Sequence, residues 1–289
     1  MNRPFIKLVV LAVLMLLSPN VSAVQYTSKD STTVVSLLCK AKKQRVKSTA
    51  DCQLFFARQL LGIPYVASTL EVNKKETLIV NLRQLDCTTY VENVTALTLC
   101  IKNGKTDFKD FCANLQKLRY RDGQNKGYQS RLHYFTDWIE NNTKLGICKE
   151  IQSPNPPFIA RQTIAVNYMT KHSDRYPMLK GDSEMINQIA KTEKNLNGKR
   201  YRYIPKRQIK NTQLLRQTIN NGDIIAIITN KKGLDTQHIG IAVWHEDGLH
   251  LLNASSIHKK VVEEPKLLND YLAEHPTMPG IRIVRLTDR

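Results

Sequence analysis

The sequence predicts an α+β fold in which several helices come first and a mostly antiparallel sheet follows. Apolar residues recur at helical spacing through the first half of the chain, whereas short apolar runs of strand length, separated by turn residues, follow residue 222. The 289 residues, 42% of them hydrophobic, are enough for a packed core. This composition excludes a wholly disordered or fibrous chain.

Residues 1–23 have the three-part pattern of a secretory signal peptide. Arg3 and Lys7 precede an apolar run from Leu8 to Leu17, and Val21-Ser22-Ala23 then offers small residues at the spacing that a signal peptidase reads. The run is too short to cross a bilayer comfortably. We therefore expect a periplasmic or secreted protein that has no stable membrane insertion after cleavage.

We expect residues 24–289 to form a single domain that opens with helices. Two apolar stripes at helical spacing lie in residues 24–62, and Gly62-Ile63-Pro64 ends the second helix, because proline disfavours helical backbone at the residue before it. Residues 66–82 alternate enough for one or two short strands, of which Leu78-Ile79-Val80 is the clearest.

A helix is predicted over residues 87–101, and Asp86 is well placed to cap it. Residues 102–215 are interpreted as a large helical insertion. Within it, helical patterns cover Phe108 to Leu118 and Leu132 to Asn141, a proline-rich connector covers 151–157, and 161–197 is helical in part.

The last part of the chain has the pattern of a sheet. Asp247-Gly248 is a hairpin signal between two apolar runs. The predicted strands are Asp223 to Ile228, His238 to Trp244, Leu249 to Asn253 and Ile281 to Leu286, with a short helix from Leu267 to Leu272.

The chain is strongly basic, with 43 Lys and Arg against 25 Asp and Glu and a formal net charge of +18. Such a charge suits nucleic acid, an anionic membrane surface or an acidic polymer. An exported protein rarely meets nucleic acid, so we expect no nucleic-acid partner. The charge is then interpreted either as attraction to an anionic cell envelope or as a lysine-rich solvated surface.

The six cysteines form no CxxC pair and no Cys/His cluster at zinc spacing, and we expect no metal site. Cys87 falls in the first turn of the predicted helix, where unsatisfied N–H groups favour a thiolate and lower the pKa of the thiol. It is interpreted either as a nucleophile or as a small buried helix residue. If Cys87 is a free thiol, up to two disulfides remain for the other five cysteines: Cys39, Cys52, Cys100, Cys112 and Cys148.

His238 and Asn253 are candidates for a base and its orienting partner. His238 opens a predicted strand after a polar loop, and its ordinary pKa suits a general base at neutral pH. Asn253 lies on the next predicted strand. If the two strands are antiparallel neighbours, the amide of Asn253 can hydrogen-bond to the imidazole and fix its tautomer. The alternative for His238 is an ordinary surface histidine.

Several motifs occur together and in one order. They are Leu61-Gly62-Ile63-Pro64-Tyr65, Leu85-Asp86-Cys87-Thr88-Thr89-Tyr90-Val91-Glu92, Asn221-Gly222-Asp223-Ile224-Ile225, His238-Ile239-Gly240-Ile241 and Leu251-Leu252-Asn253-Ala254-Ser255. The set resembles the papain-like cell-wall hydrolases of the NlpC superfamily. The long segment between Cys87 and His238, and Ser130-Arg131-Leu132-His133-Tyr134 within it, are most similar to the N-acetylmuramoyl-L-alanine amidase-like branch.

The resemblance implies a papain-like fold, a monomer and a peptidoglycan or muropeptide substrate, with no cofactor. It implies that Cys87 is the nucleophile, His238 the base and Asn253 the orienting residue. Tyr65 would line the site near the thiolate. A further set would belong to a substrate pocket specific to the branch, for which capping and packing are the alternative roles: Arg131, His133 and Tyr134.

The leading hypothesis is an exported cysteine amidase that cleaves the bond between N-acetylmuramic acid and L-alanine through a thioester. One alternative is an endopeptidase of the same fold that cuts within the stem peptide. Another is a non-catalytic wall-binding protein. The sequence leaves open whether the substrate is the polymeric wall or small anhydro-muropeptides.

Overall fold

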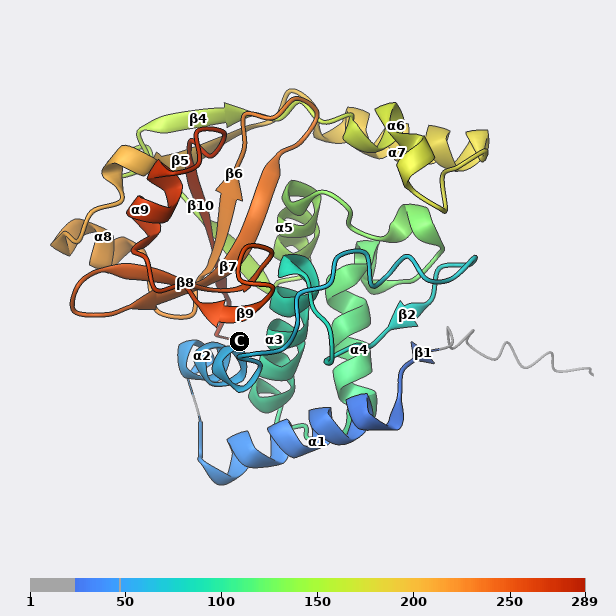
Figure 1. The fold of residues 1–289 in the computed structure, drawn as a ribbon, viewed down its shortest axis with the longest axis horizontal. Helices are drawn as coiled ribbons and strands as arrows, with labels where there is room; N and C mark the ends of the chain where they lie inside the picture. Colours follow the sequence, from blue (N-terminus) through green and yellow to red (C-terminus); the bar gives the residue numbers. More distant parts are fainter. Residues whose placement is uncertain (1–23, 47, 289) are drawn as a thin grey trace, which may run out of the picture.

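The computed structural model describes residues 24–46 and 48–288, and the predicted signal peptide of residues 1–23 lies outside them. Helices come first and strands gather toward the end of the chain (Figure 1). The described helices are α1 Ser28–Lys43, α2 Thr49–Gln59, α3 Cys87–Lys102, α4 Phe108–Arg119, α5 Phe135–Lys144, α6 Tyr168–Lys171, α7 Ser183–Leu196, α8 Gln213–Thr218 and α9 Leu268–Ala273.

Most strands of the described residues belong to one eight-stranded sheet, and all of its pairs are antiparallel. The order is β4-β5-β10-β6-β7-β8-β9, and β3 also pairs with β10. Its strands are β3 Cys148–Ile151, β4 Ala160–Thr163, β5 Arg200–Pro205, β6 Ile224–Ile228, β7 Thr236–Trp244, β8 Leu249–Ser255, β9 Lys260–Glu263 and β10 Gly280–Leu286. A separate parallel pair joins β1 Val24–Gln25 to β2 Leu78–Ile79.

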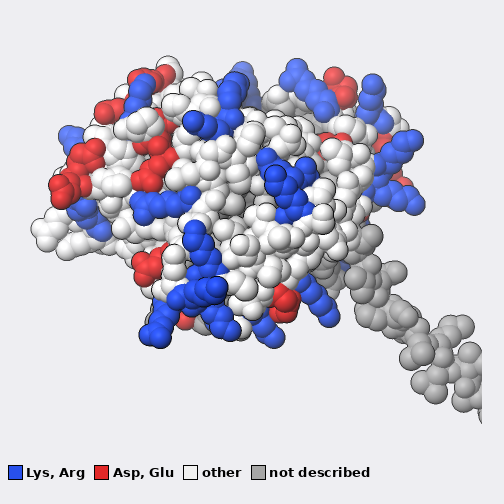
Figure 2. All heavy atoms as spheres, turned by 60° about the horizontal axis from the view of Figure 1, so that its bottom comes forward, with Lys and Arg blue, Asp and Glu red and all other residues white. Residues whose placement is uncertain are grey.

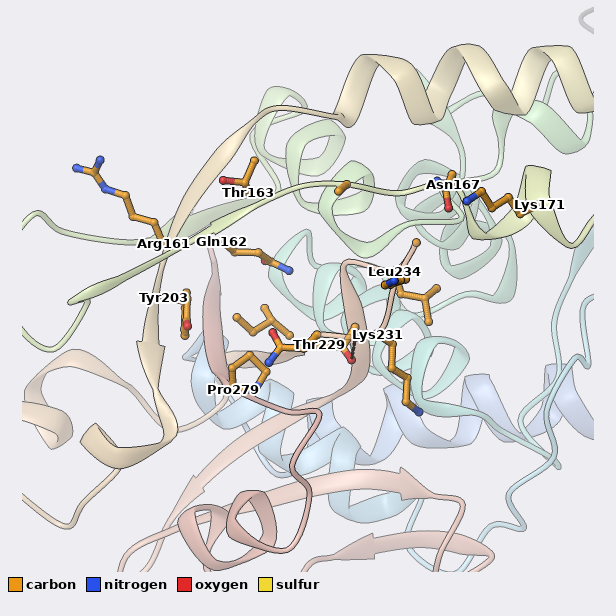
Figure 3. A pocket seen from close by; sticks show the side chains of 15 residues that line it. Arg161, Gln162, Thr163, Asn167, Lys171, Tyr203, Thr229, Lys231, Leu234 and Pro279 are labelled. Atoms are coloured by element: carbon orange, nitrogen blue, oxygen red, sulfur yellow. Dashed lines mark hydrogen bonds between the residues drawn. The ribbon is translucent and has the colours of Figure 1, made fainter.

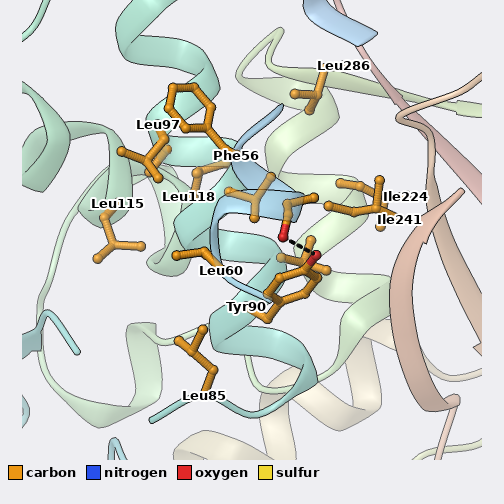
Figure 4. Packing of buried hydrophobic residues seen from close by; sticks show 14 of the residues in the cluster. Phe56, Leu60, Leu85, Tyr90, Leu97, Leu115, Leu118, Ile224, Ile241 and Leu286 are labelled. Atoms are coloured by element: carbon orange, nitrogen blue, oxygen red, sulfur yellow. Dashed lines mark hydrogen bonds between the residues drawn. The ribbon is translucent and has the colours of Figure 1, made fainter. Parts of the chain in front are cut away.

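Helix α3 is the centre of the helical layer. It packs against α1, α2 and α4 and against strands β7 and β8. Figure 4 shows Phe56 of α2, Leu97 of α3 and Ile241 of β7 in one apolar cluster, in which the hydroxyl of Tyr90 donates to the carbonyl oxygen of Ala57 at 3.2 Å. This packing fixes the first turn of α3 against the sheet.

The two faces of the sheet are buried in different apolar clusters. Ile224 and Ile241 face the α3 side, whereas Ile225 and Ala242 pack with Leu268 of α9. The alternation follows the two-residue period of a strand. A smaller third cluster surrounds α7 and includes Tyr128 and Tyr134. Apolar side chains therefore cover both faces of the sheet.

The predicted helix over 87–101 and the hairpin at Asp247-Gly248 are confirmed. Two details were wrong. The helix predicted from Leu132 begins at Phe135, because Arg131 and Tyr134 have extended backbone and Arg131 forms a β-bridge with Tyr120. The segment 102–215 was predicted to be a helical insertion, yet it supplies β3, β4 and β5 to the sheet. The alternation of charged and apolar residues in these short strands is weak. Two of them, β3 and β5, are strands because they pair with β10.

The disulfides allowed for in the sequence are absent from the described residues, where all six cysteines are free thiols. Cys52, Cys100, Cys112 and Cys148 are buried and pack as small apolar residues. Burial raises the pKa of Cys52 to about 11. Burial likewise raises the pKa of the other three, so these thiols are protonated at neutral pH.

No helix within residues 24–46 and 48–288 is both long and apolar enough to span a membrane. On the face drawn in Figure 2, Lys and Arg lie in several separate groups, with Asp and Glu between some of them. That distribution is typical of a solvated basic surface rather than of one continuous cationic stripe.

Candidate active site

Cys87 is the first residue of α3, and Asp86 caps that helix through a reciprocal pair of hydrogen bonds. The Thr89 amide donates to Asp86 Oδ1 at 2.8 Å, and the Asp86 amide donates to Thr89 Oγ1 at 2.9 Å. Just before the cap, the Leu85 amide donates to the Pro64 carbonyl oxygen at 3.0 Å. Hydrogen bonds therefore fix the backbone both just before the first turn of α3 and within it.

His238 and Asn253 come from adjacent antiparallel strands, β7 and β8. Nε2 of His238 lies 3.0 Å from Oδ1 of Asn253. Nδ2 of Asn253 donates to the Leu251 carbonyl oxygen at 3.2 Å, and this bond turns Oδ1 toward the imidazole. Because Oδ1 can only accept, the proton of the neutral imidazole sits on Nε2 and the lone pair on Nδ1.

Cys87 and His238 line the same cavity, which has a volume of about 180 Å³ and is called the catalytic cavity below. Helix α3 packs directly on β7, and Thr88 and Ile239 line the cavity beside Cys87 and His238. The structure therefore brings the predicted nucleophile, base and orienting amide to one place.

The pKa of Cys87 differs from the sequence expectation. Burial raises it to about 12, the charge of Asp86 adds to the rise, and the hydrogen bonds from Ile239 and Thr88 oppose it. Burial also lowers the pKa of His238, although Asn253 partly offsets this. The predicted low pKa is wrong for this site, because desolvation outweighs the helix terminus. At neutral pH the pair is a neutral thiol beside a neutral imidazole.

Tyr65 lies next to the start of α3, where it forms a parallel β-bridge with Leu85. Burial raises the pKa of its phenol, and the neighbouring Cys87 and Asp86 raise it further. Tyr65 therefore lies beside the start of α3, but it is not among the residues that line the catalytic cavity.

Arg131 lies outside the catalytic cavity and lines a neighbouring cavity of about 510 Å³. Its guanidinium is buried, donates to Glu71, lies 3.5 Å from Glu76 and covers the ring of Tyr128 at 4.7 Å. With these partners, the charge of Arg131 is already neutralised within the protein.

His133 and Tyr134 both line the catalytic cavity, but their polar atoms are used by the fold. Nε2 of His133 lies 2.9 Å from the Tyr128 carbonyl oxygen, and burial lowers the pKa of His133 to about 3. The Tyr134 hydroxyl donates to Glu193 at 2.7 Å and accepts from the Met169 amide at 3.2 Å. Each side chain offers the cavity mainly a ring surface.

Sequence reasoning missed two features of the cavity wall. Met169 and Tyr176 line it from the segment after β4, far from either motif, and no sequence signal marked them. Gln237 was treated as part of a polar loop, yet its Oε1 accepts from the hydroxyls of Thr229 and Thr277, both at 2.9 Å. These bonds hold the loop that leads into His238.

No group of three or more His, Cys, Asp or Glu side chains among the described residues is arranged to hold a metal ion. The polar groups around Cys87 are instead a base, an amide and backbone donors. A thiol, an imidazole and an amide in this arrangement can carry out acyl transfer.

The fold and site together define a mixed α/β protein with a Cys-His-Asn set at a helix–sheet junction. Residues 55–281 match the N-acetylmuramoyl-L-alanine amidase-like family, named AmiA-like, and the chain belongs to that family. The family is one of peptidoglycan amidase-like hydrolases. A search of curated proteins gives no match.

The chain is also similar to several solved structures. An N-acetylmuramoyl-L-alanine amidase from Bacteroides uniformis is 38% identical, with a TM-score of 0.77 over 83% of this chain and 99% of that one. A candidate xylanase from Bacteroides fragilis is 41% identical, with a TM-score of 0.74 over 80% and 98% of the two chains. A Legionella pneumophila protein shares the fold at 24% identity and a TM-score of 0.66, covering 88% and 94%.

Proposed function

We propose that this protein is an exported cysteine amidase that cleaves the bond between N-acetylmuramic acid and L-alanine in muropeptides, on a papain-like scaffold of the NlpC type. The observation that carries the proposal is the hydrogen bond of 3.0 Å between His238 and Asn253, in a cavity that Cys87 also lines. Membership of the amidase-like family supports the choice of bond.

In the first step, the Cys87 thiol gives its proton to Nδ1 of His238 as the sulfur attacks the lactyl carbonyl carbon. Because the neutral thiol is the resting form, proton transfer and attack are coupled. The imidazolium then donates its proton to the nitrogen of L-alanine, the C–N bond breaks, and the stem peptide leaves. The muramoyl group remains on the sulfur as a thioester.

In the second step, His238 accepts a proton from water, whose oxygen attacks the thioester carbonyl. The C–S bond breaks, the proton returns to the sulfur, and a muramic acid carboxylate is released. Asn253 keeps Nε2 protonated throughout, so Nδ1 stays available to the reacting groups.

The negative oxygen of each tetrahedral intermediate needs hydrogen-bond donors. Cys87 and Thr88 occupy the first two positions of α3, and amides at these positions have no acceptor within the helix. These amides and the Tyr65 hydroxyl are the donors that we assign to the oxyanion.

Export is the second part of the proposal, and the pattern of residues 1–23 supports it. Expression of the full chain in a Gram-negative host, followed by fractionation and N-terminal sequencing, tests it. A mature protein that begins at Val24 in the periplasm or medium is expected. Uncleaved chain in the cytoplasm would contradict export without affecting the amidase assignment.

Product masses test the chemistry. A purified disaccharide tetrapeptide is incubated with the protein, and the expected products are the disaccharide with a free carboxylate and a tetrapeptide that begins with L-alanine. A shortened stem still attached to sugar would instead establish the endopeptidase. Xylan is included as a substrate because one structural relative is a candidate xylanase; release of xylose oligomers would contradict the proposal.

Two cysteine variants form a matched pair for the same assay. Cys87→Ala should lower the rate at least about a thousandfold, because it removes the nucleophile. Cys39 is the exposed cysteine on α1, and Cys39→Ala should leave the rate unchanged. Hydrolysis that survives in Cys87→Ala would show that a different residue attacks the amide.

A further inference from the structure

A second cavity adjoins the catalytic cavity, and its volume is about 490 Å³. Residues of β4 and β5 form one wall, and the segment between β6 and β7 forms the other. Leu234 lines both cavities, so they meet at this side chain. Figure 3 shows Gln162 and Tyr203 on one side, Asn167 and Lys171 on the other, and Lys231 beside Leu234.

This cavity, the lysine pocket, carries uncompensated positive charge. Lys171, Lys231, Lys232 and Arg161 line it, and none of its described lining residues has a carboxylate. All four side chains are exposed. The ion pairs found among residues 24–46 and 48–288 involve other cations. Arg161 points away from the other labelled residues in Figure 3, so the three lysines supply most of the local charge.

The cavity that Arg131 lines also adjoins the catalytic cavity, and it has a different charge balance. It shares Thr88, His133 and Tyr176 with the catalytic cavity. Its arginines Arg119 and Arg131 are buried, and each contacts a glutamate. Its third arginine, Arg175, is exposed and donates to the Tyr168 hydroxyl at 3.0 Å. Two cavities of different electrostatic character therefore adjoin the catalytic cavity. One is lined by cations without carboxylates, and in the other the arginines are balanced by an equal number of carboxylates: Glu71, Asp86 and Glu92.

We propose that the lysine pocket binds free carboxylates of the stem peptide, on the leaving-group side of the scissile amide. The uncharged disaccharide then lies toward the cavity of Arg131 and Tyr176. This assignment rests on the proposed amidase function and adds to it a direction of substrate binding and a substrate class, namely acidic stem peptides.

The chemistry of the two ligand halves matches the two cavities. A stem peptide carries several carboxylates after its L-alanine, and carboxylates gain from lysine ammonium groups that lack partners. Neutral hydrogen-bonding groups of the pocket, Thr163, Asn167 and Thr229, complete its polar wall. A disaccharide has hydroxyls and amides that can accept hydrogen bonds from lysine, but it lacks the negative charge that a carboxylate brings. Paired charges beside ring surfaces suit it better.

Steady-state kinetics with matched variants tests the assignment. Lys231→Gln/Lys232→Gln removes two charges from the pocket, and Lys42→Gln/Lys43→Gln removes two exposed charges from α1. Each protein is assayed on a muropeptide with free stem carboxylates and on the same muropeptide with those carboxylates amidated.

The pocket variant should raise KM for the acidic substrate about tenfold with kcat nearly unchanged, because the lost interaction is the same in the ground and transition states. Its KM for the amidated substrate should equal that of wild type. The α1 variant should behave like wild type on both. Equal KM changes for acidic and amidated substrates, or no change in the pocket variant, would overturn the assignment.

A binding experiment separates this assignment from the amidase proposal. Free acidic tetrapeptide is titrated into Cys87→Ala by calorimetry, with and without the two pocket substitutions. Binding that weakens about tenfold with those substitutions, and weakens with added salt, supports the pocket. Binding unaffected by the substitutions overturns it. A wild-type protein that fails to hydrolyse any muropeptide contradicts the amidase proposal instead, so the failures are distinguishable.

Discussion

On one side of the catalytic cavity, Arg119 and Arg131 are buried and contact Glu92 and Glu71. On the lysine-pocket side, Lys231 and Lys232 are exposed and do not take part in the ion pairs of the described residues. Both walls contain cationic side chains. They differ in whether each charge has a partner inside the protein.

The difference separates charges that hold the fold from charges that are available to a ligand. A buried arginine costs free energy unless a carboxylate compensates its charge. Removing the arginine leaves that carboxylate buried without a partner, which destabilises the fold. Exposed lysines are stabilised by water and contribute little to folding. Substitution of the buried arginines should therefore lower mainly the stability of the fold, whereas substitution of the exposed lysines should weaken mainly ligand binding.

Arg119→Met is expected to have the largest effect on stability. Arg119 donates to Glu92 and to the Ile79 carbonyl oxygen, both at 2.7 Å, and its loss leaves a buried carboxylate without a partner. We expect a loss of about 3–5 kcal/mol in the free energy of unfolding, measured with urea. Glu92→Gln in the same chain should recover part of it. A loss below about 1 kcal/mol would show that the pair is not what compensates the buried charges.

His133 lines both the catalytic cavity and the cavity of Arg131. Its low pKa predicts that the stability of the protein depends on pH. As pH falls from 6.5 toward 3, the unfolded chain binds a proton at this histidine that the folded protein does not bind. Stability is therefore complete above pH 6.5 and is lost on acidification, by about 2.7 kcal/mol at pH 4.5. His133→Gln should be less sensitive to acid in thermal unfolding. An identical pH dependence in both proteins would contradict the low pKa.

Asn253→Ala tests the hydrogen bond that orients His238, which lines the catalytic cavity. The amide orients His238 but does not touch the proposed reacting atoms, so kcat should fall about 10- to 100-fold, which corresponds to about 1.4–2.7 kcal/mol. Asn253→Gln keeps the chemistry but moves the oxygen. Asn253→His retains an acceptor and should recover more activity than alanine does. Full activity in Asn253→Ala would remove the orienting role.

Lys231→Gln/Lys232→Gln is expected to have the smallest effect on stability. Because these side chains are exposed, the free energy of unfolding should change by less than about 0.5 kcal/mol. Urea denaturation of this variant beside Arg119→Met provides the comparison directly. A loss of several kcal/mol would mean that the lysines also support the fold.

The sequence could predict those parts of the site that depend on local pattern. Asp86 as cap, the period of α3 and the turn at Asp247-Gly248 each lie within a few residues of what they determine. Together they place Cys87 at a helix start and His238 near Asn253. The order of the motifs then indicates the family.

What the sequence could not predict depends on distant partners. Strand β3 is recruited by β10, and Arg131 is neutralised by Glu71, some 60 positions earlier. The pKa of Cys87 follows from burial under β7, which reverses the effect expected from the helix terminus alone. Contacts between residues far apart in the sequence determine these properties, and local composition does not predict such contacts.

The most direct test of the catalytic proposal is the mass of the trapped intermediate. The protein is mixed with a disaccharide tetrapeptide, quenched in acid during turnover and digested for mass spectrometry. We predict that the peptide containing Cys87 gains the mass of the muramoyl disaccharide acyl group, and that the adduct is absent from Cys87→Ala. An adduct that carries a peptide acyl group, or one on another residue, would contradict the proposed reaction.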